Sequence, residues 1–196
     1  KEVDIFNTFQ GRGHTMSEAP LDWYPQPRLD TPLFLLTSAR TASAAEAFAY
    51  TLQSAKRATV VGEASMGAAN PGGDVDAGHG FSVFVSFATP INPITKTNWE
   101  GRGVTPDVGV EPALALVTAH RLALEAVLAQ GQPSEVATDT RWALDALRAE
   151  IGASPRVDAD DYAGTYGVME VGTQQERLVL KQGRRPVRTL LPLGND

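Results

Sequence analysis

The first half of the chain contains two short apolar runs separated by an amphipathic segment. Residues 33–36 and 59–62 lack polar alternation, as is typical of buried parallel strands. Between them, from Ser43 to Lys56, apolar residues recur at spacings of three and four, which predicts an amphipathic helix. A strand, a helix and a second strand within about thirty residues predict a parallel pair joined by a right-handed crossover.

The pattern changes on both sides of this unit. Residues 8–29 show no periodicity and are predicted to be an irregular surface segment, and the glycine-rich stretch 62–80 is predicted to be a long loop. Phe81–Phe87 alternates strictly, which predicts a half-buried strand. Another loop is expected over 89–103, followed by a short strand near 108–110.

The second half of the chain is predicted to begin with a helical hairpin. Pro112 can open a helix that runs to about Gln130, and a second helix is expected over Ser134–Ile151. An acidic linker over 153–161 follows. Short strands of a small β module are expected within 162–167, 178–180 and 187–193.

Composition excludes several classes of protein. The 196 residues carry 17 Lys and Arg against 23 Asp and Glu, a net charge of −6, and no cysteine. Disulfide frameworks and Cys-ligated metals are thereby ruled out. Without a dense basic cluster we expect no nucleic-acid partner. No apolar run approaches the ~20 residues of a membrane span, so we expect a soluble chain with no membrane span. No signal peptide is visible, and the absence of an initiator Met suggests a fragment.

The segment from Thr37 to Glu46 is the most informative part of the sequence. It reads as the end of a strand, a polar turn and the start of a helix, the place where open α/β sheets bind ligands. A hydroxyl at Ser43 would lie beside the Ala44 amide and the positive end of the helix dipole, which suits a developing oxyanion. Ser43 and Glu46 also fit an S-x-x-E capping box, in which the serine only caps the helix. Spacing leaves both interpretations open.

Two sequence blocks resemble a known family. Residues 32–63, PLFLLTSARTASAAEAFAYTLQSAKRATVVGE, resemble the nucleophile segment of the S41 peptidases, which include C-terminal processing proteases, the tricorn core protease and the interphotoreceptor retinoid-binding proteins. Residues 91–117, INPITKTNWEGRGVTPDVGVEPALALV, are similar to a second block of the retinoid-binding-like and tricorn-like branch. The resemblance implies an α/β fold with a partial crotonase/ClpP-like core.

The resemblance also implies roles for particular residues. Ser43 would be the nucleophile, the Ala44 amide an oxyanion donor, and Glu100 the group that orients a histidine base. Where the processing-protease branch has its lysine base, this chain has Ala68. For Glu100 the alternative is a loop residue tied to Arg102 or to a backbone amide.

The base is not found at a matching position. None of two lysines and three histidines occupies the place of the family's base: Lys56, Lys96, His14, His79 and His120. The family's D-L-R-x-N-x-G-G turn, which supplies the second oxyanion donor, is also missing from these residues. We therefore expect the base and the second donor to come from outside this chain segment.

These inferences give a set of expectations for the whole chain. Residues 1–111 would be the C-terminal half of an S41 peptidase core, 112–152 the helical hairpin, 153–161 the linker and 162–196 an incomplete β module. The expected function is a serine-type endopeptidase acting on a peptide or protein substrate, with no metal and no cofactor. A homo-oligomer is possible, and the family suggests an extracytoplasmic location, periplasmic or secreted.

Two alternatives remain open at this stage. The missing lysine and the apolar residues Met66 and Phe81 favour a non-catalytic module of the same fold that binds an apolar ligand or a peptide. An acyl-CoA enzyme shares the core fold, but no feature of the sequence indicates CoA recognition. Fold alone does not decide among these functions.

Overall fold

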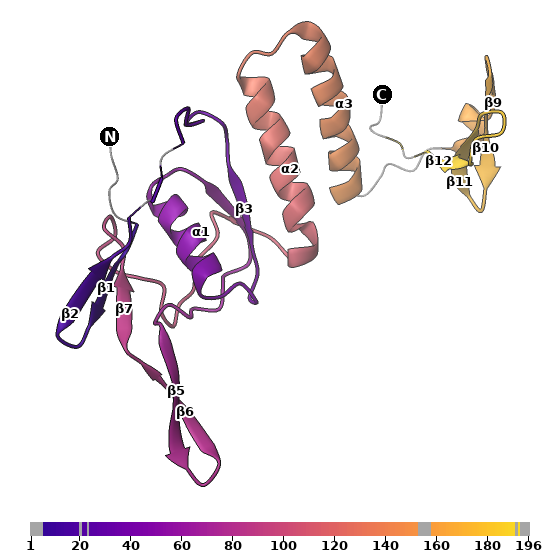
Figure 1. The fold of residues 1–196 in the computed structure, drawn as a ribbon. Coiled ribbons are helices and arrows are strands. Elements are labelled where there is room, and N and C mark those ends of the chain that lie inside the picture. The colour runs from indigo at the N-terminus through magenta and orange to yellow at the C-terminus, as the bar shows by residue number, and fades with distance from the viewer. Residues whose placement is uncertain (1–5, 20, 23, 153–157, 191, 193–196) are drawn as a thin grey trace. The chain divides into compact units, whose positions relative to one another are not determined.

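The computed structural model describes residues 6–19, 21–22, 24–152, 158–190 and 192. The chain divides into two compact units, Lys1–Ala119 and His120–Asp196 (Figure 1). This boundary lies inside a helix rather than at residue 111, and the four-part division expected from sequence stays a prediction. Residues 153–157 of the expected linker and 193–196 of the expected β module lie outside the described residues.

A small parallel sheet forms the centre of the first unit. Strands β3 (Phe34–Thr37), β4 (Thr59–Gly62) and β8 (Val108–Gly109) pair in the order β3-β4-β8, all parallel. Helix α1 (Ala44–Ser54) connects the first two strands, so the predicted strand–helix–strand unit is confirmed and the fold is α/β.

The burial of the two predicted strands differs. Val60 and Val61 of β4 are fully buried, as their apolar run predicts. In β3 only Thr37 is buried, and Leu36 is exposed, so the prediction of a buried strand is wrong there. The physical reason is position: within the described part of the chain, β4 lies between two strands, whereas β3 pairs with a strand on one side only.

A second sheet lies in the segment that was predicted to be irregular. Strands β1 (Thr8–Gly11), β2 (His14–Ser17) and β7 (Ala88–Ile91) pair antiparallel in the order β2-β1-β7. The predictions of an irregular segment from residue 8 and of a loop from residue 89 are therefore wrong over these strands. Each strand has four residues, too few for hydrophobic alternation to stand out.

Strands β5 (Gly72–Gly78) and β6 (Phe81–Ser86) form a separate hairpin, which extends away from α1 in Figure 1. The predicted strand at β6 is confirmed, whereas β5 lies where a loop was expected. Every residue of β6 is exposed, so the expected half-burial is wrong. Alternation predicts one buried face, but among the described residues the hairpin pairs only with itself.

Two long helices follow the first unit's sheets. Helix α2 (Pro112–Ala129) crosses the boundary between the units, and α3 (Ser134–Ile151) lies in the second; both predicted helices are present. Among the described residues, α2 is the one helix long and apolar enough to cross a membrane. Core helices of soluble proteins meet the same criteria, so the absence of a membrane span stays a prediction.

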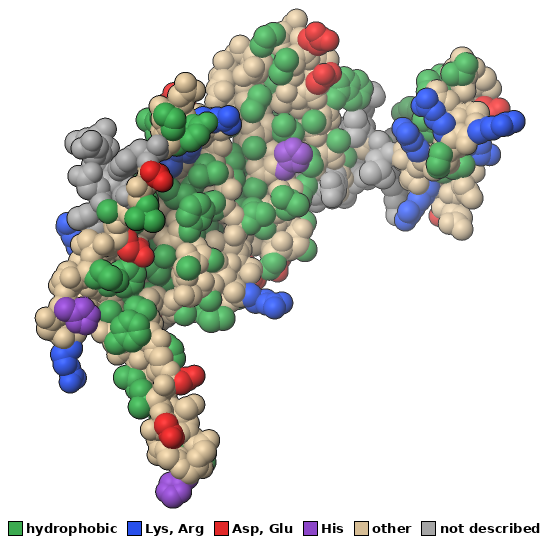
Figure 2. Space-filling model, in the orientation of Figure 1, with side chains coloured by type: hydrophobic (Ala, Val, Ile, Leu, Met, Phe, Trp, Pro, Cys, Tyr) green, Lys and Arg blue, Asp and Glu red, His purple; other side chains and the backbone are tan. Residues whose placement is uncertain are grey.

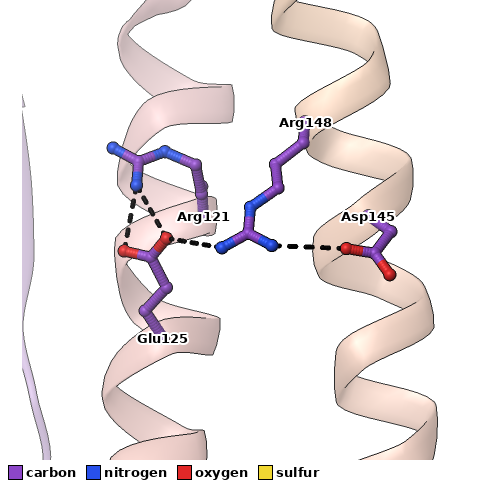
Figure 3. Close-up of polar contacts among 4 residues, drawn as sticks. All are labelled: Arg121, Glu125, Asp145 and Arg148. Carbon is purple, nitrogen blue, oxygen red and sulfur yellow. Dashed lines mark hydrogen bonds and ion pairs between the residues drawn. The ribbon is translucent and has the colours of Figure 1, made fainter. Parts of the chain in front are cut away.

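An ion-pair network joins α2 to α3 within the second unit (Figure 3). Glu125 accepts from Arg121 at 2.8 Å and lies 3.5 Å from Arg148, which also approaches Asp145 at 3.3 Å. These side chains are substantially exposed, and such pairs contribute at most about 1 kcal/mol each. Buried Leu144 and Ala137 of α3 are therefore the larger contribution to the stability of this unit.

The small β module is present in the second unit. A short 3-10 helix (Ala159–Tyr162) precedes four antiparallel strands in the order β12-β11-β10-β9, namely β9 (Gly164–Tyr166), β10 (Met169–Gln174), β11 (Arg177–Lys181) and β12 (Arg188–Thr189). Strand β10 had no sequence signal because its residues are mostly polar and exposed. Leu178 and Val179 of β11 are its buried residues among those described.

Candidate active site

Ser43 lies at a strained turn between β3 and α1. The turn is closed by the Thr41 amide, which donates to the Ser38 carbonyl, and by the Ser38 amide, which donates to Thr41 Oγ1 at 3.0 Å. Ser43 then adopts φ 56° and ψ −123°, a region that residues other than glycine rarely occupy. Its side chain is exposed. Strained backbone of this kind concentrates at functional sites, and a serine on a sharp strand-to-helix turn is the geometry of a nucleophile elbow.

Ser43 also caps α1, mainly through its backbone amide. The Ser43 amide donates to the Glu46 carboxylate at 2.9 Å, and both halves of a capping box can be recognised. The Ser43 hydroxyl nevertheless makes no side-chain hydrogen bond to the helix end that meets ordinary geometry. Capping and nucleophilic roles are therefore compatible at this residue.

Ala44 is the first residue of α1 and is exposed. Among the described residues its amide finds no hydrogen-bond acceptor, as expected of a first-turn donor. The positive end of the helix dipole lies at the same place. This amide can therefore donate to an oxyanion next to Ser43 Oγ, although its role as the oxyanion donor stays a prediction.

Glu46 is the central buried polar group of the site, and its side chain is 0% exposed. One carboxylate oxygen accepts from the Ser65 hydroxyl at 2.5 Å and from the Gly67 amide at 2.6 Å. The other accepts from the amides of Ser43 and Ala68, each at 2.9 Å. Burial alone raises the pKa of Glu46, but these four hydrogen bonds outweigh it and leave the pKa below its ordinary value. The carboxylate is therefore ionised at neutral pH.

Sequence reasoning noticed Glu46 only as a capping residue. A signal was present, because Glu46 is three residues before Ala49 and so lies on the buried face of α1. An acidic residue at such a position needs several donors. Which donors would meet it depends on a loop twenty residues away, and spacing along the chain does not predict that.

Two loops are fastened to each other and to α1 through this carboxylate. Ser65 Oγ, which donates to Glu46, accepts from the Val104 amide at 2.6 Å. The Gly101 amide donates to the Gly67 carbonyl at 2.8 Å. Gly103 has φ +74°, and a Cβ there would lie 2.2 Å from the Ser65 carbonyl oxygen. The backbones approach so closely because this position has no side chain.

Glu100 lies on the second of these loops and is exposed. One of its oxygens, Oε2, accepts from the amides of Ala69 and Asn70 at 2.7 and 2.8 Å. These contacts are the backbone tie that the sequence offered as the alternative, with no bond to Arg102. The other oxygen has no hydrogen-bond partner among the described residues. The structure places no histidine against Glu100, and its role as orienter stays a prediction.

The described residues place no base beside Ser43. The Ala68 amide, at the position of the processing-protease lysine, is taken up by Glu46. None of the lysines and histidines considered from sequence lines the cavity at Ser43: Lys56, Lys96, His14, His79 and His120. Within the same residues, no three acidic or imidazole side chains are grouped to hold a metal ion.

A cavity of about 410 Å³ opens beside Ser43. One face of α1 forms one wall, and β1, its flanking residues and the two loops form the others. The apolar lining residues are Phe6, Phe9, Ala44, Ala47, Phe48, Leu52, Ala69, Pro71 and Trp99. Glu18 is the only charged group among the described lining residues. The cavity is therefore suited to an apolar group of aromatic size next to the Ser43 hydroxyl.

Solved structures similar to this chain include a processing protease, a lipoprotein and mature CPAF. The photosystem II D1 C-terminal processing protease is 34% identical over 43% of this chain and 22% of its own, with a TM-score of 0.37. A lipoprotein from Streptococcus agalactiae is 17% identical over 62% of this chain and 45% of its own, with a TM-score of 0.46. Mature CPAF is 17% identical over 56% of this chain and 23% of its own, with a TM-score of 0.44. The chain spans less than half the length of each of these proteins.

The family comparison covers most of the first unit of the chain. The model of peptidase family S41 matches residues 4–110, a region that contains Ser43, Glu46, both loops and Glu100. The match spans more than half of the 196 residues. The branch suggested by the second block stays a prediction. The resemblance to the S41 peptidases is confirmed, and the protein belongs to peptidase family S41.

Proposed function

We propose that Ser43 is the nucleophile of a serine endopeptidase. The observation that carries the proposal is the conformation of Ser43: a non-glycine residue held at φ 56° and ψ −123°, exposed, at the N-terminus of α1. A serine that only caps a helix has extended backbone and needs no such strain. The amide of Ala44 beside it, which has no acceptor among the residues that the structure describes, supplies a donor where the negative charge of the reaction would develop.

The proposed reaction passes through an acyl-enzyme. Ser43 Oγ attacks the carbonyl carbon of the peptide bond while the base takes the hydroxyl proton, and the carbonyl oxygen accepts from the Ala44 amide. The tetrahedral intermediate breaks its C–N bond, and the base returns the proton to the departing amine. Water, deprotonated by the same base, then hydrolyses the ester and restores Ser43. The base and the second oxyanion donor belong to residues outside those described.

Glu46 is proposed as the positioning residue of this site. Its ionised carboxylate holds the Ser43 amide on one side and the amides of Gly67 and Ala68 on the other. The turn that strains Ser43 and the loop that borders the cavity are therefore fixed by one group. A low pKa keeps Glu46 from acting as the base, because a base must take up a proton near neutral pH.

The cavity indicates which side chains are preferred next to the scissile bond of a peptide or protein substrate. Its lining is apolar, and a side chain next to the scissile bond would enter it from Ser43. Glu18 at the lining repels acidic side chains. We therefore expect cleavage beside large apolar residues in preference to Asp or Glu. The extracytoplasmic location expected from the family belongs to the same proposal.

Labelling by a serine-directed phosphonate in the full-length protein tests the nucleophile. We expect one label on the peptide that contains Ser43, and loss of both label and peptide hydrolysis in Ser43→Ala. Ser54→Ala, on the same helix, is the control and should retain both. Proteolysis that persists in Ser43→Ala would overturn the proposal.

A second function deserves the same test because the cavity is large and apolar and the described residues hold no base. A non-catalytic module would bind a fatty acid or retinoid in the cavity, without phosphonate labelling, and with equal affinity in Ser43→Ala. Phe48→Asp would abolish that binding because it places a charge in the apolar wall.

A further inference from the structure

The hairpin of β5 and β6 has an edge that nothing in the described structure pairs. Strand β6 bonds to β5 on one side and to no strand on the other. All of its residues are exposed, and Phe84 is 60% exposed. An isolated two-stranded hairpin is only marginally stable in water, and further strands stabilise it. Hydrophobic side chains lie along this hairpin in the surface view (Figure 2).

The two edges of the hairpin differ in their protection. Strand β5 carries Asp74 and Asp76, and charges on an edge discourage pairing with another strand. Strand β6 carries no charge and no proline. Its Phe81, Val83 and Val85 share one face, and all three are exposed. The unprotected edge is therefore that of β6, and it is the edge open to strand addition.

The sequence along this edge is its own mirror image. Residues 81–87 read Phe-Ser-Val-Phe-Val-Ser-Phe in both directions, with Phe84 at the centre. Antiparallel pairing of two such strands about Phe84 sets like residues opposite each other. Phe81 would face Phe87 of the second copy, Ser82 would face Ser86, and Val83 would face Val85. Such a self-complementary edge is what a two-fold symmetric interface requires.

We propose that β6 pairs antiparallel with β6 of a second copy of this chain, about a two-fold axis at Phe84. The product is a four-stranded sheet in the order β5-β6-β6-β5, with the charged β5 strands at its outer edges. Because directly opposed residues share a face, the apolar face of one hairpin continues into that of the other. The contact is one strand wide, so the dimer should depend on protein concentration.

Disulfide trapping tests both the pairing and its register, because the chain has no cysteine of its own. In full-length Phe84→Cys, with any cysteine outside the 196 residues replaced by serine, the two-fold axis places the two thiols opposite each other, within the range of a disulfide. We expect a covalent dimer under mild oxidation. Asp74→Cys is the matched control: Asp74 is paired with Phe84 in the hairpin, but the two copies of it would be three strand spacings apart.

The register predicts a further pattern. Ser82→Cys alone should form no disulfide, whereas a mixture of Ser82→Cys and Ser86→Cys proteins should form the mixed dimer. Val83→Lys, which places a charge on the free edge, should remain monomeric by light scattering and retain its circular dichroism. A wild-type protein that stays monomeric at high concentration, or a Phe84→Cys variant that forms no covalent dimer, would overturn the proposal.

Discussion

Glu46 is the single residue whose loss should cost the first unit most. Its carboxylate satisfies four donors at once, and the bonds from Ser65 and Gly67 are buried. The neutral amide of Glu46→Gln offers one acceptor oxygen and adds donors of its own. We expect a loss of about 3 kcal/mol in the free energy of unfolding, measured by urea denaturation. Glu63→Gln is the control, because the Glu63 carboxylate accepts one exposed bond of 3.3 Å and the substitution should change the free energy of unfolding by less than about 0.5 kcal/mol.

Glu46 also makes the stability of the folded protein depend on pH in the acid range. The pKa of Glu46 is lower in the folded protein than its ordinary value of 4.5, so the folded state binds fewer protons than the unfolded state. The stabilisation is complete above the ordinary value and is lost as pH falls through the folded pKa. The melting temperature of the wild type should therefore decrease below about pH 4.5 more steeply than that of Glu46→Gln. Parallel curves would contradict this linkage.

Glu100 allows its two proposed roles to be separated by one substitution. Oε2 accepts both loop amides, and the carbonyl oxygen of Glu100→Gln can take over this tie. The change removes the acceptor character of the other oxygen, which an oriented imidazole needs. If Glu100 orients the base, kcat should fall at least 100-fold with KM and melting temperature unchanged; the equivalent change in a known protease triad costs roughly 10⁴. An unaltered kcat would leave Glu100 as a loop residue.

At the scale of elements, the contact between the two loops depends on the absence of a side chain at Gly103. Gly103→Ala places a Cβ 2.2 Å from the Ser65 carbonyl oxygen and must also hold φ +74°. Gly101→Ala has a similar φ of +67° but meets nothing within 4 Å. The matched pair therefore separates backbone strain from steric clash. We expect the free energy of unfolding to fall by about 1 kcal/mol in Gly101→Ala and by at least twice that in Gly103→Ala, measured by thermal unfolding. Equal losses would contradict the close approach.

Sequence reasoning succeeded for the elements whose signal is local. Helices α1, α2 and α3 could be predicted because their periodicity spans many residues. Strand β4 could be predicted because a buried strand is a continuous apolar run. Strands β1, β2 and β7 were missed because four residues carry little pattern. The environment of β6 was misjudged because alternation reports which residues share a face, and does not report whether another layer covers it.

The candidate site divides in the same way. Ser43, Ala44 and Glu100 were named from the motif blocks, which carry residue identity. The Ser43 amide is the donor to Glu46 that the capping box predicts. The other three donors could not be predicted, because they lie on a loop about twenty residues further along the chain. The same limit explains why Glu46 was interpreted as a cap alone.

At the scale of the whole molecule, net charge and the exposed edge of β6 act together. The chain carries −6 at pH 7 and has a pI of about 5.1, so repulsion between copies disappears as pH falls toward 5. The β6 edge itself has no charge to lose, and its pairing should then strengthen. We expect the apparent mass by light scattering to rise from pH 7 to a maximum near pH 5 in the wild type. Val83→Lys should flatten this rise in apparent mass. Val136 is an exposed valine on α3, so Val136→Lys adds the same charge away from the β6 edge and should retain the rise. Identical profiles for the two lysine variants would show that association near the pI does not use this edge.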